Sequence, residues 1–334
     1  MTAYSNHLCN LAKDIGMKRT LREKLLAIIM AVAMAVTVTP VMAFAAEDGG
    51  AAGGIQLQNP VVEDGVSTWD CIYFGSYPQS SDGNDGFITE PIKWRVLSVD
   101  GDGAFLLADK SLDARAYNTE FAEVTWETCT LRSWLNGYDA SYNTYGTDYS
   151  SDNFINTAFT STEQSAVKTT KVVNNDHPSG IEGGNDTNDK IYLLSTEEVT
   201  TPAYGFTSDY NKTATRQVKT TAYAKERGAN TNTDGNGLYW LRSPGNGSNK
   251  AVVGFYDGAV AYNGGEVSRA DFVVRPVLHI NLGSSSWNYA GSVSSDGTEK
   301  DGITSVTLPA YSYEYTGSPI TPEPVVWYGD AVLE

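Results

Sequence analysis

The chain has 334 residues, of which 41% are hydrophobic and 19% charged, and its formal net charge is −17. This length and hydrophobic content predict about two domains with a sizeable core and exclude a broadly disordered chain. The acidic excess repels polyphosphates and anionic lipid surfaces, and no basic stripe offsets it, so nucleic acid is excluded as a partner. Abundant Gly, Ser, Thr and Asn are typical of a turn-rich extracellular protein.

The N-terminal segment has the three parts of a secretory signal peptide. A basic stretch over 18–24 precedes an apolar run over 25–36, and the small-x-small sequence 43–45 follows. The alternative is a transmembrane anchor, but the apolar run is shorter than the roughly 20 residues that a span needs. We therefore predict that residues 1–45 are a signal peptide with an extension before Met17, and that the mature protein is secreted or at the cell surface without a membrane span.

Composition divides the rest of the chain into a main domain, two linkers and a tail. Residues 46–54, AEDGGAAGG, are typical of a flexible linker, and so are residues 283–302, which contain GSSS and SSDG. Residues 55–282 have the pattern of one α+β domain, with helices in the middle and β structure at the end. Residues 303–334 form a short β-rich tail.

The first expected elements of the main domain are a β-hairpin and a helix. Residues 92–99 and 104–108 are strands, because the DGDG sequence between them favours a hairpin turn. The segment 125–137 is a helix, because Leu131, Trp134 and Leu135 lie on one face and Asn136-Gly137 can end it.

Two later segments carry the Ser/Thr-x-x-Glu spacing of a capping box. Thr160 and Glu163 begin one helix, and Ser195 and Glu198 have the same spacing at the end of the strand predicted from residue 190.

A third helix and a β section complete the main domain. The helix is predicted over 215–228, and the β section has strands at 238–243 and 272–282 with a hairpin over 251–262 between them. Because Pro276 cannot donate to a ladder, we expect the last strand to lie at a sheet edge or to be bulged there.

Cysteine usage leaves one question open. Cys9 precedes the predicted leader, so the mature chain has only Cys71 and Cys129. Export leads to an oxidising compartment where this pair is a disulfide candidate, and the alternative is two free buried thiols. Their spacing does not resemble a zinc site. We predict no metal and no cofactor.

The stretch YWLRSPG, residues 239–245, is the most distinctive of the chain, and it has two interpretations. In the first, Trp240 is a stacking platform and Arg242 binds an anion or a hydroxyl. In the second, Trp240 is in the core and Arg242 ties the loop to carboxylates or carbonyls with its planar head. The candidate ligand-binding residues are Trp240, Arg242, Asn246, Asn249, Tyr256 and Arg275.

The same ambiguity applies to Arg275. We expect Arg242 and Arg275 to lie close together and enclosed, with acidic partners such as Asp257 and Asp271, because hairpin-linked strands separate them and a buried charge without partners is costly.

No catalytic set is visible in the sequence. Ser243 is not in a G-x-S-x-G elbow, and neither His177 nor His279 has a spacing that pairs it with a serine. The EF-hand-like sequence at 82–86 is followed by Lys93 where the twelfth position requires glutamate. We predict no catalytic residues.

Seven ordered motifs resemble an uncharacterised domain of secreted and surface proteins from gut Firmicutes, domain of unknown function 6273. The resemblance covers roughly residues 69–282. The motifs are IYFGSYPQ (72–79), IKWRVLSVDGDGAFLLA (92–108), YNTEFAEVTWETCTLRSWLN (117–136), FINTAFTSTEQSAV (154–167), DKIYLLSTEEV (189–199), YWLRSPG (239–245) and VRPVLHI (274–280).

Two further resemblances concern the late β section and the tail. The arginine-bearing strand, polar loop, hairpin and VRP strand resemble the C-terminal half of C-type-lectin-like folds, especially the formylglycine-generating-enzyme branch. This implies an α+β, C-type-lectin-like domain with mixed or antiparallel sheets and two to four helices. It does not imply that branch's copper chemistry, since both mature cysteines lie before residue 130.

The tail sequence YEYTGSPITPEP resembles the first strands of bacterial immunoglobulin-like surface repeats. Residues 303–334 are too few for a sandwich of about 100 residues, which implies a truncated segment or further surface modules after residue 334.

These observations favour a secreted or cell-surface, non-catalytic binding or adhesion module whose ligand is a glycan or a protein. One alternative is an enzyme with an unrecognised site near Arg242 and Arg275. The other is a structural spacer of a larger surface protein.

Overall fold

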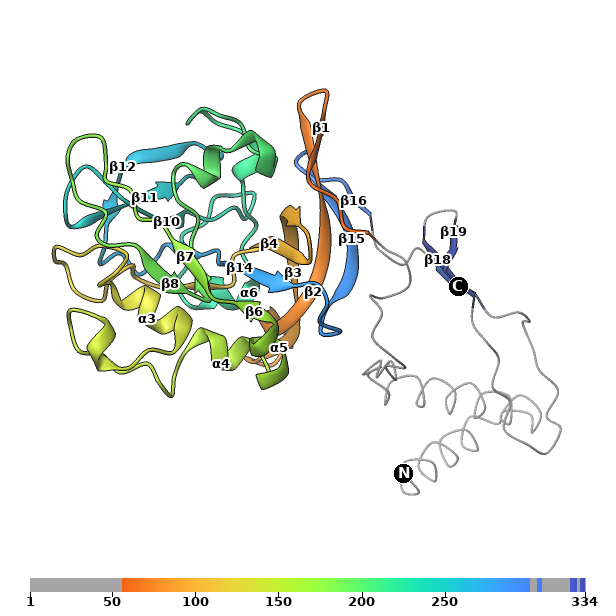
Figure 1. Ribbon diagram of the computed structural model, residues 1–334, viewed down its shortest axis with the longest axis horizontal. Helices are drawn as coiled ribbons and strands as arrows, with labels where there is room; N and C mark the ends of the chain where they lie inside the picture. The colour runs from red at the N-terminus through yellow and green to blue at the C-terminus, as the bar shows by residue number, and fades with distance from the viewer. Residues whose placement is uncertain (1–55, 301–304, 308–324, 329–330, 334) are drawn as a thin grey trace, which may run out of the picture. The chain divides into compact units, whose positions relative to one another are not determined.

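The computed structural model describes residues 56–300 and three short strands beyond them, and Figure 1 shows the arrangement of these elements. The predicted signal peptide and the linker at 46–54 lie outside the described residues. In the tail, β17 (Ser305–Thr307), β18 (Val325–Tyr328) and β19 (Ala331–Leu333) form an antiparallel sheet of their own.

One antiparallel sheet forms the frame of the main domain. Its strand order is β16-β15-β2-β3-β4-β14-β6, with β1 added at β2 and β9 at β14. The strands are β1 (Val61–Glu63), β2 (Val66–Ser81), β3 (Phe87–Asp100), β4 (Gly103–Ala108), β6 (Val167–Lys168), β9 (Ile191–Tyr192), β14 (Val277–Asn281), β15 (Asn288–Ser294) and β16 (Glu299–Lys300).

The predicted first hairpin is confirmed. Strands β3 and β4 pair antiparallel from Trp94 opposite Ala108 to Asp100 opposite Gly103. Ile92, Trp94 and Val96 alternate into the core, because successive strand residues point to opposite faces.

A second, smaller sheet carries the distinctive motif. It has the order β12-β11-β10-β13-β5, and its β10–β13 pair is parallel, so this sheet is mixed. Its strands are β5 (Asp113–Ala114), β10 (Tyr239–Pro244), β11 (Lys250–Gly254), β12 (Val260–Glu266) and β13 (Val273–Val274), and a separate ribbon pairs β7 (Thr170–Val172) with β8 (Thr187–Asp189). The hairpin predicted over 251–262 is confirmed by the β11–β12 pairing.

The last predicted strand is in fact two strands in different sheets. The chain leaves the small sheet after β13, passes Arg275 and Pro276, and enters the large sheet as β14. Pro276 sits at this junction, where its missing N–H breaks no ladder. The expectation of an edge strand is therefore wrong for β14, which pairs with β4 on one side and with β6 and β9 on the other.

Four short helices complete the described α+β domain. They are α3 (Thr130–Asn136), α4 (Phe154–Ala158), α5 (Ser161–Ala166) and α6 (Ala222–Glu226), with 3₁₀ turns η2 (Ala140–Tyr142), η3 (Glu198–Thr200), η4 (Pro202–Tyr204) and η5 (Ala214–Arg216). Helix α3 buries Leu131, Trp134 and Leu135 and ends at Gly137, whose φ of 69° is the left-handed conformation expected of a terminating glycine.

The capping prediction for α5 is confirmed, whereas the third helix is much shorter than predicted. Thr160 and Glu163 form both hydrogen bonds of a capping box. Only Ala222–Glu226 of the predicted 215–228 is α-helical, because the β-branched residues before it are extended and the Thr221 hydroxyl caps α6 by accepting from the Ala224 amide at 3.1 Å.

The described part of the segment predicted as a linker, residues 283–300, is part of the domain. Strand β15 pairs with β2 and carries β16 on its other side, and Trp287, Ala290 and Val293 are buried. The turn-forming residues of this segment surround a strand whose apolar positions complete the large sheet, so the linker prediction is wrong here.

The disulfide candidate is corrected to two free thiols. Cys71 and Cys129 are both buried and unpaired. The Cys71 thiol faces the Trp69 carbonyl at 3.8 Å, and the Cys129 thiol faces the Trp126 carbonyl at 3.4 Å. Burial raises the pKa of each thiol to about 12.

These thiols should resist alkylation in the native protein. Peptides with Cys71 and Cys129 should stay unlabelled by iodoacetamide, because the thiolate is the reactive form and burial disfavours it. After unfolding without reductant, both should be labelled, as measured by peptide mass spectrometry. A peptide pair linked through these cysteines before reduction would contradict the structure.

Candidate functional site

The motif YWLRSPG does not present an aromatic surface to solvent. Trp240 on β10 has no exposed surface, and its ring contacts Phe272 and Tyr117 at centroid distances of 4.6 and 5.6 Å. Its indole N–H donates to the Arg115 carbonyl at 2.9 Å. Trp240 is thus a core residue with a satisfied donor, and the interpretation as a stacking platform is wrong.

Arg242, two residues on, uses its whole guanidinium within the protein. Its Nε and Nη2 donate to the Val173 carbonyl at 3.3 and 3.1 Å, and Nη1 donates to the Leu193 carbonyl at 2.8 Å. Both terminal nitrogens also donate to the carboxylate of Glu198. These bonds occupy the five N–H donors of the group, so no donor remains for a ligand.

Glu198 connects this arginine to the predicted capping pair. Its Oε2 accepts from the Ser195 amide at 2.8 Å, and its own amide donates to the Ser195 hydroxyl at 3.1 Å. The Ser195–Glu198 spacing therefore forms the expected reciprocal bonds. The carboxylate then joins η3 to β10 through Arg242.

Arg275 is also buried, but its contacts differ from those of Arg242. It is 2% exposed, its Nε donates to the Ala108 carbonyl at 2.9 Å, and its guanidinium lies 5.8 Å from the centre of the Tyr239 ring. Burial, together with the nearby charge of Arg95, lowers its pKa to about 9.

The expected acidic partners of the two arginines are wrong. Asp257 pairs with Lys212 at 3.0 Å, and Asp271 pairs with Arg269 at 2.6 Å. Arg242 and Arg275 share no hydrogen-bond acceptor among the described residues, so the structure does not unite them into one site.

The remaining candidates lie on turns of the small sheet. Asn246 and Asn249 are in the turn between β10 and β11, where the Asn246 side chain accepts from Lys250 Nζ at 3.2 Å and the Asn249 carbonyl accepts from the Val267 amide at 3.0 Å. Tyr256, between β11 and β12, donates its hydroxyl to Asn230. None of these three residues lines the hollow beside α3 and β8 or the one beside Arg115 and Trp134.

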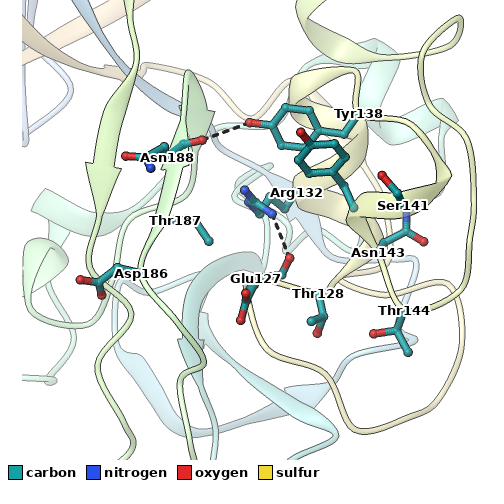
Figure 2. A pocket seen from close by; sticks show the side chains of 11 residues that line it. Glu127, Thr128, Arg132, Tyr138, Ser141, Asn143, Thr144, Asp186, Thr187 and Asn188 are labelled. Atoms are coloured by element: carbon teal, nitrogen blue, oxygen red, sulfur yellow. Dashed lines mark hydrogen bonds between the residues drawn. The ribbon is translucent and has the colours of Figure 1, made fainter.

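A hollow of about 640 Å³ lies instead between α3, η2 and the ribbon strand β8, and Figure 2 shows it from close by. Its lining is mostly polar. The lining residues are Glu127, Thr128, Arg132, Tyr138, Ser141, Tyr142, Asn143, Thr144, Asp186, Thr187 and Asn188. We call this the α3–β8 hollow.

A buried ion pair fixes the floor of the α3–β8 hollow. Arg132 of α3 donates through Nε to Asp189 at 2.8 Å and through Nη1 to the Glu127 carbonyl at 2.9 Å. Asp189 has no exposed surface, and its carboxylate also accepts from Trp126, Tyr138 and Thr187. Because these four donors come from different segments, the Asp189 carboxylate fixes the positions of α3, the loop before it and β8 relative to one another.

Two tyrosines form an aromatic shelf beside this ion pair. The rings of Tyr138 and Tyr142 stack at 4.5 Å and 27°, and the guanidinium of Arg132 lies 5.1 Å from the centre of the Tyr138 ring. The hydroxyl of Tyr138 donates to Asp189 and to the Asn188 carbonyl at 3.2 Å each, and burial and the Asp189 charge raise its pKa. Tyr142 is 48% exposed, so its ring stays accessible on a rigid support.

Several polar groups of the α3–β8 hollow have capacity for a ligand. Within residues 56–300, Nη2 of Arg132 donates no hydrogen bond, and the side chains of Tyr142, Thr144 and Asn188 make none. Together they supply guanidinium, hydroxyl and amide groups around an aromatic ring. This combination can bind a polar molecule with one apolar face.

The spacing of an arginine and two tyrosines around the end of α3 is the sequence signal for this site, although it matches no known motif. Tyr138 and Tyr142 are four residues apart across the end of α3, and Arg132 precedes Tyr138 by six. Their meeting depends on Gly137, which turns the chain, and on Asp189, which is distant in sequence.

Among the described residues no group of three or more His, Cys, Asp or Glu side chains is arranged to hold a metal ion. In the same part of the chain, no helix is both long and apolar enough to cross a membrane.

Comparison with known families decides where the chain belongs. A family model described as "Domain of unknown function (DUF6273)" matches residues 101–282, more than half of the chain. The chain belongs to the DUF6273 family. The matched DUF6273 segment begins at the turn between β3 and β4 and contains the whole α3–β8 hollow as well as Arg242 and Arg275.

The other two comparisons give no relative. No curated protein and no solved structure matches the chain.

Proposed function

We propose that this DUF6273 domain is a non-catalytic glycan-binding module of a secreted or cell-surface protein, and that the α3–β8 hollow holds the sugar. The observation that carries the proposal is the exposed Tyr142 ring on its stacked support. Beside it in the hollow are Nη2 of Arg132 and the side chains of Thr144 and Asn188, which make no hydrogen bond among the described residues. A sugar ring has an apolar C–H face that packs on an aromatic ring and a rim of hydroxyls that needs donors and acceptors.

Charge and shape favour a glycan over other ligands. A nucleobase could also stack on a tyrosine, but a chain of net charge −17 repels the phosphates attached to it. A stable protein interface takes about 20–30 residues on each side, whereas the hollow is lined by 11 residues and has a volume of about 640 Å³. A single sugar or the end of a chain fits that volume, which lies within the usual range of ligand sites of about 300–1,000 Å³.

The cellular setting and the fold class of this proposal come from the sequence. The leader-like N-terminus, the glycine-rich segment 46–54 and the immunoglobulin-like tail favour an exported, modular surface protein that binds or adheres. The resemblance of the arginine-bearing strand, polar loop, hairpin and VRP strand to the C-terminal half of C-type-lectin-like folds favours that scaffold for the domain.

The test replaces the exposed ring of the shelf. Tyr142→Ala should abolish the binding seen for the full chain on a glycan array, because the stacking surface is lost. It should lower the free energy of unfolding by no more than about 1.5 kcal/mol, which is the upper end of the stabilisation that an aromatic pair contributes.

Tyr210→Ala is the matched control. Tyr210 is 44% exposed and stacks on Tyr262 at 5.1 Å and 24°, so it is close to Tyr142 in exposure and in support but lies outside the hollow. Binding should survive in this variant. Loss of binding in Tyr210→Ala with retention in Tyr142→Ala would place the glycan elsewhere, and an array without any bound glycan would contradict the proposed function.

A further inference from the structure

Helix α3 separates the α3–β8 hollow from a second one. The second hollow has a volume of about 310 Å³ and is lined by Thr130, Leu131 and Trp134 of the helix, together with Arg115, Arg227, Tyr149 and smaller residues. Arg132 and Trp134 are two positions apart and therefore point to different sides of the helix. We call this second space the arginine hollow.

Arg115 is held flat in the arginine hollow while its donors stay unused. Its guanidinium lies over the Trp134 ring at 4.0 Å from the centroid. Its Nε is buried without a hydrogen bond and contacts Oδ2 of Asp113 only at 3.5 Å. Stacking on the indole fixes the plane of the group and leaves its N–H edge available.

Arg227 supplies a second cation to the same place. Its Nε lies 3.6 Å from Oδ1 of Asp113, and its side chain is 47% exposed. Within residues 56–300, the side chains of Arg115 and Arg227 donate no hydrogen bond at all. Two guanidinium groups thus present unfilled donors at the arginine hollow.

The shared carboxylate cannot satisfy both arginines. Asp113 has no exposed surface, and its oxygens already accept from the Tyr77 hydroxyl at 2.8 Å and from the Ala114 amide at 2.7 Å. Asp113 carries one negative charge, and Arg115 and Arg227 carry two positive charges. The three groups together therefore have a net charge of +1 in an acidic protein. A partly enclosed cation without hydrogen-bond acceptors is unfavourable, so this site favours an added anion.

We propose that the arginine hollow binds the carboxylate of a small organic acid. A carboxylate brings the one negative charge that balances Asp113, Arg115 and Arg227, and its two oxygens match the paired donors of a guanidinium. The hydroxyls of Thr119 and Ser268, which make no hydrogen bond among the described residues, line the space where the rest of the acid lies. This proposal is independent of the glycan site.

The test compares two sugars that differ in one group. D-glucuronate carries a carboxylate where D-glucose has a hydroxymethyl, and calorimetry on the full chain should find D-glucuronate at least about tenfold tighter, as expected for a charged hydrogen bond. Arg227→Gln should reduce D-glucuronate affinity by about tenfold or more. Because Arg227 is half exposed, the variant should fold with an unchanged melting temperature.

Arg269→Gln is the matched control, since Arg269 is 48% exposed and pairs with the carboxylate of Asp271 outside the arginine hollow. D-glucuronate binding should persist in this variant and in Tyr142→Ala. Equal affinities for D-glucuronate and D-glucose, unchanged D-glucuronate binding in Arg227→Gln, or binding of inorganic phosphate without binding of D-glucuronate would each overturn the proposal.

Discussion

Replacing Arg242 with alanine is expected to lower the free energy of unfolding by about 3–5 kcal/mol, the usual effect of breaking a buried ion pair. Arg242 is 5% exposed, and its removal leaves the Val173 and Leu193 carbonyls without their donor. The carboxylate of Glu198 also loses its cation, although it is 23% exposed and keeps water on one side. Urea unfolding of the two proteins measures the difference.

Arg269→Ala is the control for this prediction. The Arg269–Asp271 pair is also an arginine–carboxylate contact, but it is exposed, so its removal should change the free energy of unfolding by less than about 1 kcal/mol. If Arg242→Ala were as stable as Arg269→Ala and had lost glycan binding instead, Arg242 would be a ligand residue rather than a structural one.

The second large effect is expected at Asp189. Asp189→Ala removes the acceptor of Arg132, Trp126, Tyr138 and Thr187 in a place with no exposed surface. Leaving the Arg132 guanidinium without its carboxylate should lower the free energy of unfolding by about 3–5 kcal/mol. The variant should also lose glycan binding, because the shelf depends on the hydrogen bond from Tyr138.

Asp186→Ala is the control for Asp189→Ala, because it removes a carboxylate from the same hollow without removing the buried ion pair. Asp186 lies directly before β8, lines the same hollow, and pairs with the exposed Lys171 at 3.0 Å. Its replacement should leave stability close to that of the parent protein in the same urea experiment. Equal destabilisation by the two substitutions would show that Asp189 does not organise the hollow.

Local patterns predicted the local structure of this chain well. The Asp100–Gly103 turn, the apolar face of α3 and the Thr160–Glu163 capping box each depend on residues within a few positions of one another. Such features are fixed by backbone geometry and short-range hydrogen bonds, so they are readable in the sequence alone.

The errors of the sequence predictions arose where distant segments decide the outcome. Residues 288–294 are surrounded by serine and glycine, and only their pairing with β2 makes them a strand. Pro276 marks a change of sheet that a single strand pattern cannot reveal. The third helix is shortened because bridges at Lys219 and Thr220 hold that stretch extended.

The candidate site was misplaced for a related reason. The sequence of an arginine-bearing strand does not reveal whether the guanidinium N–H groups bond to protein acceptors or are available to a ligand. For Arg242 they are filled by Val173, Leu193 and Glu198, three positions that no spacing rule connects to it. For Arg132 they are partly open, and the shelf beside it depends on an ion pair across 57 residues.

Hydrogen–deuterium exchange of the full chain, with and without a glycan identified on the array, tests the location of the binding site most directly. Bound glycan should slow exchange in residues 127–144 and 186–188, which surround the α3–β8 hollow. Slowed exchange confined to the turns around Asn246, Asn249 and Tyr256, with no change in those two segments, would contradict the assignment and return the site to the small sheet.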